Sequence, residues 1–201
     1  MDEPEFLKQL GDEARRDGVP IIKPETAALL KTLLAMKKPV NVLEVGTAVG
    51  YSAILMSLYI PEGAKITTIE NYEKRIGAAR NNIRAAGKES VITLLEGDAM
   101  EILPGLMPGY DFVFMDAAKG QYPGFLPYVM RLLLPGGILV SDNVLQDGSI
   151  ADSRYAIERR DRTIHTRMRD YLWKLTHDKQ LTTSVLQVGD GVAVSVKAGE
   201  M

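Results

Sequence analysis

The stretch Val42-Leu43-Glu44-Val45-Gly46-Thr47-Ala48-Val49-Gly50-Tyr51-Ser52 decides the fold. A short β-rich run ends at Gly46, and a helical pattern begins at Tyr51, directly after a second glycine. Glycine lets the backbone turn tightly and approach a ligand closely. A strand, a glycine loop and a helix in this order are typical of a ligand-binding α/β sheet, although a tight turn without a ligand also fits these residues.

The rest of the chain repeats the alternation of strands and helices. After two N-terminal helices (3–16 and 24–34), we expect strands at 40–45, 65–70, 91–95, 111–115 and 137–140, and helices at 51–59, 73–86, 99–106, 122–134 and 154–175. Two final strands, 182–186 and 192–196, flank the hairpin-like turn 188–191. The pattern predicts one α/β domain over residues 1–201, with 1–37 as a helical extension. Its seven-stranded sheet is mostly parallel, has an antiparallel hairpin strand at the C-terminal end, and carries helices on both faces.

Composition excludes several functional classes. Of the 201 residues, 46% are hydrophobic and 25% are charged, which is ordinary for a globular domain. The absence of cysteine excludes disulfides, thiolate metal sites and cysteine nucleophiles. No apolar run approaches the roughly 18 residues of a membrane span, and the first residues do not resemble a signal peptide. We therefore expect a cytoplasmic protein without membrane contact. Its net charge of −2 argues against nucleic-acid binding over the whole surface.

Acidic residues lie at five successive strand ends. They are Glu44, Glu70, Asp98, Asp116 and Asp142. One such acid is usually a cap or a turn residue, but five in succession indicate a site, because ligands of open α/β sheets bind beyond the carboxyl ends of the strands.

The first three strand ends suit a nucleoside without phosphates. The loop after the first strand lacks the Gly-Lys-Ser/Thr ending of a triphosphate loop and the Gly-x-Gly-x-x-Gly pattern of a dinucleotide loop, and Glu44 would repel a pyrophosphate. A carboxylate at Glu70 can accept hydrogen bonds from both ribose hydroxyls, and an adenine would lie beside Asp98 and Ala99. A charged amino-acid group would complete the ligand, and S-adenosylmethionine has this shape.

The last two strand ends supply oxygen ligands. Asp116, Asp142 and Asn143 offer two carboxylates and an amide, which suit a hard cation such as Mg²⁺. The alternative, a helix cap at Asp116 and an Asx turn at Asp142, stays open on spacing alone.

Three motifs together resemble the class I methyltransferases, and within them the catechol and caffeoyl-CoA O-methyltransferase group. These motifs are 42–52, 116–122 (Asp-Ala-Ala-Lys-Gly-Gln-Tyr) and 141–144 (Ser-Asp-Asn-Val), and the resemblance runs from about residue 22 to 196. It implies a Rossmann-like fold, S-adenosylmethionine as methyl donor, Mg²⁺ or another divalent cation held by Asp116, Asp142 and Asn143, Lys119 as the base, and a homodimer. The implied cofactor contacts are Ile22, Gly46, Ser52, Glu70, Asp98, Ala99 and Asp116.

A basic segment lies between residues 154 and 174 and contains seven basic and three acidic residues. At helical spacing, Ile164, Met168, Leu172 and Leu175 form the expected buried stripe, and Arg159, Arg162 and Arg169 fall on the other side. These arginines could bind a phosphate backbone, as in tRNA, or form an ordinary solvated face with salt bridges.

The segments 157–165 and 188–193 resemble the bacterial branch of this group that methylates 5-hydroxyuridine at the wobble position of tRNA. This base places a hydroxyl beside a carbonyl oxygen, a pair that could chelate a metal as a catechol does. Ala117 and Ala118 would leave a mouth wide enough for a nucleotide. Our first hypothesis is therefore a tRNA methyltransferase. The second is O-methylation of a small hydroxylated aromatic substrate, either a catechol or a hydroxycinnamoyl thioester, and the third is a cofactor-binding module without catalysis.

Overall fold

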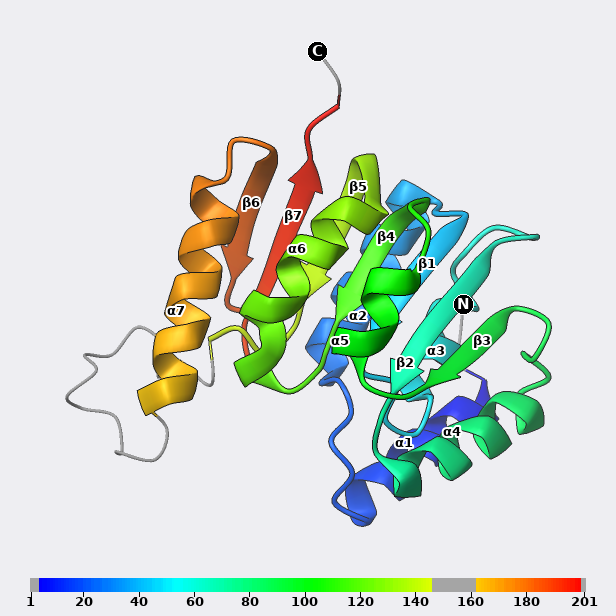
Figure 1. Ribbon diagram of the computed structural model, residues 1–201. Helices are drawn as coiled ribbons and strands as arrows, with labels where there is room; N and C mark the ends of the chain where they lie inside the picture. The colour runs from blue at the N-terminus through cyan, green and yellow to red at the C-terminus, as the bar shows by residue number, and fades with distance from the viewer. Residues whose placement is uncertain (1–3, 146–161, 200–201) are drawn as a thin grey trace.

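A single seven-stranded sheet forms the centre of the protein (Figure 1). The computed structural model describes residues 4–145 and 162–199. The strand order is β3-β2-β1-β4-β5-β7-β6, with β1 to β5 parallel and β7 antiparallel to both of its neighbours. The strands are β1 (Asn41–Val45), β2 (Lys65–Glu70), β3 (Ile92–Glu96), β4 (Tyr110–Met115), β5 (Leu133–Ser141), β6 (Leu181–Leu186) and β7 (Val192–Lys197). The expected mostly parallel sheet with an antiparallel C-terminal hairpin is confirmed.

Helices cover both faces of this sheet, as expected. One face is covered by α1 (Glu5–Arg16), α2 (Pro24–Lys37), α3 (Tyr51–Met56) and α4 (Glu73–Ala85). The other is covered by α5 (Ala99–Ile102), η1 (Leu103–Gly105), α6 (Tyr122–Leu132) and α7 (Arg162–His177), and the short helix η2 (Lys119–Gln121) precedes α6. Within residues 4–145 and 162–199, no helix has the length and apolar character needed to cross a membrane.

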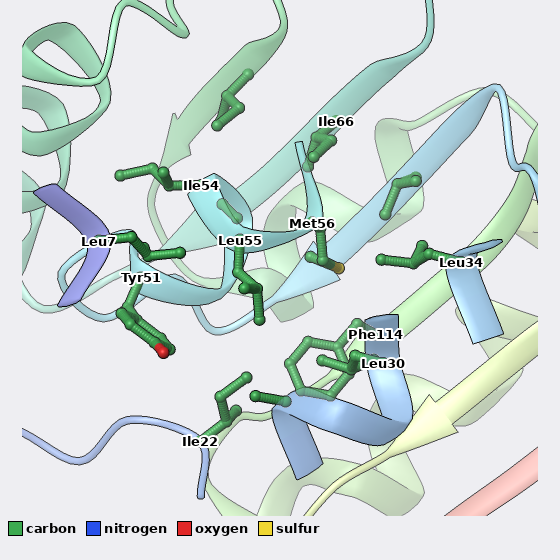
Figure 2. Packing of buried hydrophobic residues seen from close by; sticks show 14 of the residues in the cluster. Leu7, Ile22, Leu30, Leu34, Tyr51, Ile54, Leu55, Met56, Ile66 and Phe114 are labelled. Carbon is green, nitrogen blue, oxygen red and sulfur yellow. The ribbon is translucent and has the colours of Figure 1, made fainter. Parts of the chain in front are cut away.

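The N-terminal helices contribute directly to the core. Leu7 of α1 and Leu30 and Leu34 of α2 are almost fully buried against α3 and the sheet, together with Phe114 of β4 (Figure 2). Burying each such leucine contributes on the order of 1.5–3 kcal/mol relative to leaving it exposed. The extension at residues 1–37 therefore completes one hydrophobic layer of the domain.

Several local predictions differ from the structure. The helix expected at 122–134 ends at Leu132, and β5 begins at Leu133, well before the expected 137. A register shift on β4 lets Pro135 and Gly136 lie inside an irregular strand. The helix expected at 99–106 ends at Ile102. The short helix η1 follows it, because Pro104 cannot continue the α-helical hydrogen bonds.

The buried face of α7 is rotated from the expected stripe. Ile164 is exposed, and the buried side chains are His165, Met168, Tyr171 and Leu175. Tyr171 turns towards the sheet because its hydroxyl hydrogen bonds to Ser141 at 2.6 Å. The first part of the helix expected at 154–175 lies outside the described residues.

Gly46 allows β1 to pass very close to the end of β4. Its φ is +103°, and a Cβ atom at this position would lie 2.0 Å from the carbonyl oxygen of Asp116. On the other side of the loop, the backbone amides of Gly46 and Thr47 donate to the Ile69 carbonyl at 3.0 and 3.2 Å. The loop is therefore held between β2 and β4 at the carboxyl edge of the sheet.

We predict that Gly46→Ala destabilises the fold by at least about 2 kcal/mol more than Gly63→Ala, measured by urea unfolding. Gly63 is the matched control, because its φ is also positive at +83° but a Cβ there would have no neighbour within 4 Å. Equal losses for the two variants would show that the backbone contact at Asp116 has no special cost.

Candidate active site

A cleft of about 620 Å³ opens at the carboxyl ends of β1, β2, β3 and β4, a volume typical of small-molecule sites. Its walls come from the glycine loop, the segments that follow β2 and β3, and the segment from Asp116 through η2. Of the predicted site residues, the cleft is lined by Gly46, Glu70, Asp98, Ala99, Asp116, Lys119 and Asn143. The sheet therefore brings the predicted cofactor end and most of the predicted catalytic end into one cavity.

Glu70 organises the cofactor end through its carboxylate. One oxygen accepts the backbone amide of Ala48 at 2.7 Å, and the other accepts those of Asn71 and Tyr72 at 3.1 and 2.9 Å. A carboxylate offers about four acceptor positions, so room remains for a ligand hydroxyl. The side chain is only 8% exposed and its exposed part faces the cleft.

Asp98 and Ala99 line the same cleft at the start of α5. Asp98 caps this helix, because its carboxylate accepts the Met100 amide at 2.8 Å. The predicted adenine position thus combines a capped helix start with the buried Ala99.

Sequence patterns did not reveal several other residues of the wall. Tyr72 and Arg75 line the cleft, and the guanidinium of Arg75 lies 5.3 Å from the centre of the Tyr72 ring. Pro20, Gln121 and Phe125 also line it. Asn71 and Tyr72 directly follow β2, so a strand-end rule could have found them, whereas nothing local marks Pro20.

Asp116, Asp142 and Asn143 lie together at the ends of β4 and β5. The Asn143 amide nitrogen donates to Asp116 Oδ1 at 3.0 Å, and its backbone amide donates to Asp142 Oδ1 at 2.8 Å. Asn143 adopts a left-handed backbone with φ +59°, which asparagine tolerates better than most residues. Asp142 is 2% exposed and lies behind Asp116 and Asn143, outside the cleft wall.

Both carboxylates are held in surroundings that disfavour negative charge. Burial raises the pKa of Asp116 to about 6, and the Asn143 amide and Lys119 partly oppose this rise. Burial and the nearby Asp116 charge raise the pKa of Asp142 to about 7. Two neighbouring carboxylates repel each other, so a bound cation would stabilise the pair in its charged form.

Lys119 reaches the cleft from η2, directly after the Asp116 turn. The guanidinium of Arg167 on α7 donates to the Gly120 carbonyl at 3.1 Å and so fixes η2. The buried Tyr122 hydroxyl hydrogen bonds to the carbonyls of Met115 and Asp142, both at 3.0 Å, and thereby ties the ends of β4 and β5. Lys119 is thus presented by a short helix that is fixed on both sides.

Two predicted cofactor contacts do not line the cleft. Ile22 is buried in the core beside Tyr51 and Leu30 (Figure 2). Ser52 is 7% exposed in the first turn of α3. A cofactor contact at either residue stays a prediction.

Glu44 was expected to place its charge in the cofactor loop, and this expectation is wrong. Side chains alternate along a strand, so Val45 faces the cleft and Glu44 points to the opposite face, where it is fully buried. The Thr68 hydroxyl donates to its carboxylate and also lies 2.5 Å from the Thr47 hydroxyl. Burial raises the pKa of Glu44 to about 7, against the nearby hydroxyls of Ser52 and Thr68.

Of the three predicted phosphate-binding arginines, Arg162 and Arg169 lie on α7, and Arg159 lies outside the described residues. α7 packs against η2, so this basic helix lies beside the segment that carries Lys119.

The donor set fits a divalent cation that keeps part of its water shell. Within the part of the chain that the structure describes, no three carboxylate or histidine side chains converge on one point. The site would therefore depend on Asp116, Asp142 and the Asn143 amide oxygen, an all-oxygen set of the kind that Mg²⁺ takes together with water and substrate oxygens.

The chain matches the O-methyltransferase family model over residues 1–198 and belongs to this family. It is 35% identical over 141 residues to a catechol O-methyltransferase from Niastella koreensis, a match that covers 67% of this chain and 64% of that relative's length. It also resembles the solved structure of a candidate caffeoyl-CoA O-methyltransferase from Staphylococcus aureus (TM-score 0.90, 32% identity, 97% of this chain and 93% of that one). A third similar structure is TomG, an O-methyltransferase of tomaymycin synthesis from Streptomyces achromogenes solved with S-adenosylmethionine (TM-score 0.85, 25% identity, 98% and 92% covered).

We predict that Glu44→Gln removes a pH-dependent loss of stability. The folded-state pKa of about 7 lies above the ordinary 4.5 of the unfolded chain. The free energy of unfolding of the wild type, minus that of the variant, should therefore fall by at most about 3 kcal/mol as the pH rises from 4.5 to 7. Above pH 7 this difference should stay constant.

Urea unfolding in EDTA between pH 4.5 and 8.5 measures this difference, with the exposed Glu101→Gln as the control. A constant difference between wild type and Glu44→Gln across this range would contradict the assignment.

Proposed function

We propose that this protein is an O-methyltransferase that uses S-adenosylmethionine and a divalent cation, Mg²⁺ in the first instance, to methylate a small aromatic substrate with two neighbouring oxygens, such as a catechol or a hydroxycinnamoyl thioester. One observation carries the proposal. Asp116 belongs both to the cofactor cleft and to the cluster of oxygen donors, and Lys119 reaches the same cleft. The catechol enzyme and the candidate caffeoyl-CoA enzyme among its relatives support this substrate class.

The cofactor cleft suits a nucleoside with an amino-acid group. Glu70 would accept a ribose hydroxyl, and Ala99 and Asp98 would border the adenine. S-adenosylmethionine supplies a methyl group on a sulfonium, which is already an activated donor. The S-adenosylmethionine bound to TomG supports the choice of cofactor.

At the catalytic end, Asp116, Asp142 and Asn143 would hold the cation. The cation supplies a positive charge that favours the deprotonated form of a substrate hydroxyl. Lys119, as the neutral amine, would take the proton of that hydroxyl on its ε-nitrogen and become an ammonium, from the position that η2 and Arg167 give it. The walls of the cleft then align the substrate oxygen with the methyl group, and this alignment accounts for much of the rate.

A second candidate is the 5-hydroxyl of a wobble uridine in tRNA. One structural observation favours it, because α7 carries four Arg or Lys side chains and one acidic one and packs beside η2, which lines the cleft. The relatives described above are named for small-molecule chemistry or for O-methylation alone, so the small aromatic substrate is the better supported candidate.

The substrate class is tested with labelled S-adenosylmethionine, Mg²⁺ and three acceptors in parallel: caffeate, caffeoyl-CoA and tRNA that carries 5-hydroxyuridine. We expect label on caffeate or caffeoyl-CoA, lost in EDTA and restored by added Mg²⁺. Label on tRNA alone would contradict the small-molecule proposal and select the second candidate. Transfer that survives EDTA would contradict the role of the cation.

Lys119→Met should lower kcat by about 100- to 10,000-fold while leaving the affinity for S-adenosylhomocysteine within a few-fold, because the base acts on the acceptor and not on the cofactor. Steady-state kinetics and calorimetry measure the two quantities. Lys179→Met, at an exposed turn after α7, is the control. Wild-type kcat in Lys119→Met would remove the base from the mechanism.

The homodimer implied by the family resemblance, and a cytoplasmic location, stay predictions. Sedimentation at micromolar concentration tests the dimer, and a monomeric mass would contradict it.

A further inference from the structure

We propose that Thr26, in the first turn of α2, is a positioning residue for the metal ligand Asp142, so that the N-terminal helix forms part of the cation site. This inference depends on the cation of the proposed function. It concerns a residue that lies 116 positions from Asp142 in the sequence and outside the cleft wall.

The contact joins two almost fully buried side chains. The Thr26 hydroxyl is 3.3 Å from Asp142 Oδ1, and the two residues are 1% and 2% exposed. The Asn143 backbone amide donates to the same oxygen at 2.8 Å. Within the described residues, both hydrogen bonds to this carboxyl fall on Oδ1, which leaves Oδ2 for a cation. Two donors on one oxygen fix the rotation of the carboxyl plane, as second donors commonly do for metal ligands.

Thr26 is itself held by the turn between β6 and β7. A Cβ atom at Gly189 would lie 2.6 Å from the Thr26 hydroxyl, so the turn backbone packs directly on it. Lys23, the residue before α2, forms an ion pair with Asp190 of the same turn. The start of α2 is therefore fastened to the hairpin at the point where Thr26 reaches Asp142.

The ion pair also affects the charge at the site. The Asp190 carboxylate lies near enough to repel the charges of Asp116 and Asp142. Lys23 offsets this third negative charge from outside the cluster. The start of α2 thus supplies a hydroxyl that orients one ligand and a cation that balances a neighbouring acid.

The alternative is that the Thr26 hydroxyl only satisfies hydrogen bonding in the core. Two substitutions separate the roles. Thr26→Val keeps the shape and removes the hydroxyl, whereas Thr26→Ser keeps the hydroxyl and removes a methyl group. A core role makes both variants lose stability without changing metal affinity, whereas a positioning role makes only the valine variant lose metal affinity.

The test is Mn²⁺ binding to the cofactor-free protein at pH 8, followed by the electron paramagnetic resonance signal of free Mn²⁺. We expect the dissociation constant to rise 10- to 100-fold in Thr26→Val and to stay within about threefold in Thr26→Ser. In turnover, Thr26→Val should raise the Mg²⁺ concentration for half-maximal rate by a similar factor, with kcat at saturating Mg²⁺ close to wild type. Circular dichroism and S-adenosylhomocysteine affinity in EDTA report folding, and Thr26→Ala provides the deletion if the valine variant does not fold.

The outcomes distinguish the inference from the proposed function. Equal Mn²⁺ affinity in wild type and a folded hydroxyl-deletion variant would overturn the role of Thr26 and leave the cation site standing. Absence of Mn²⁺ binding in wild type would overturn the cation site and the role of Thr26 with it.

Discussion

Two carboxylates, the half-buried Asp116 and the buried Asp142, lie side by side at the ends of neighbouring parallel strands, and their mutual repulsion is the constraint on which the candidate site depends. The parallel pairing of β4 and β5 brings them together although 26 positions separate them in the sequence. Burial disfavours the charged form of each, and each charge disfavours the other. Asn143 and Lys119 offset part of this cost at Asp116, and Thr26 does so at Asp142.

This constraint connects the two halves of the cleft. Asp116 follows β4 at the point where Gly46 lets the glycine loop pass against its backbone, so the carboxylate cluster and the loop that borders the cofactor cleft are in direct contact. Tyr122 holds the carbonyls at both strand ends from the other side. A methyl donor and an activated oxygen must meet in line, and a rigid shared wall at Asp116 is a direct way to fix their separation.

The sequence predicted the sheet and the strand-end residues well, because both depend on local signals. Alternating apolar runs, glycines at turns and acids after strands are all visible within a few positions. The errors have tertiary causes. The register shift between β4 and β5 makes Pro135 part of a strand, and the bond between Tyr171 and Ser141 rotates α7 away from the stripe expected around Ile164. The prediction for Glu44 was wrong because neighbouring side chains of a strand point to opposite faces, and on β1 it is Val45 that faces the cleft.

The lining of the cleft was predictable where one residue follows one strand, and not where distant segments meet. Glu70, Asp98, Asp116 and Lys119 follow strands and line the cleft, whereas their roles stay predictions. No periodicity links Thr26 to Asp142, or Lys23 to Asp190, because α2 and the β6–β7 turn meet only in the folded chain.

The most direct test is a crystal structure with Mn²⁺ and S-adenosylhomocysteine, in which anomalous scattering locates the manganese. We expect one manganese peak bounded by oxygens of Asp116, Asp142 and Asn143, beside a cofactor whose ribose is hydrogen bonded to Glu70. A manganese peak elsewhere, or a cofactor outside the cleft, would contradict this expectation.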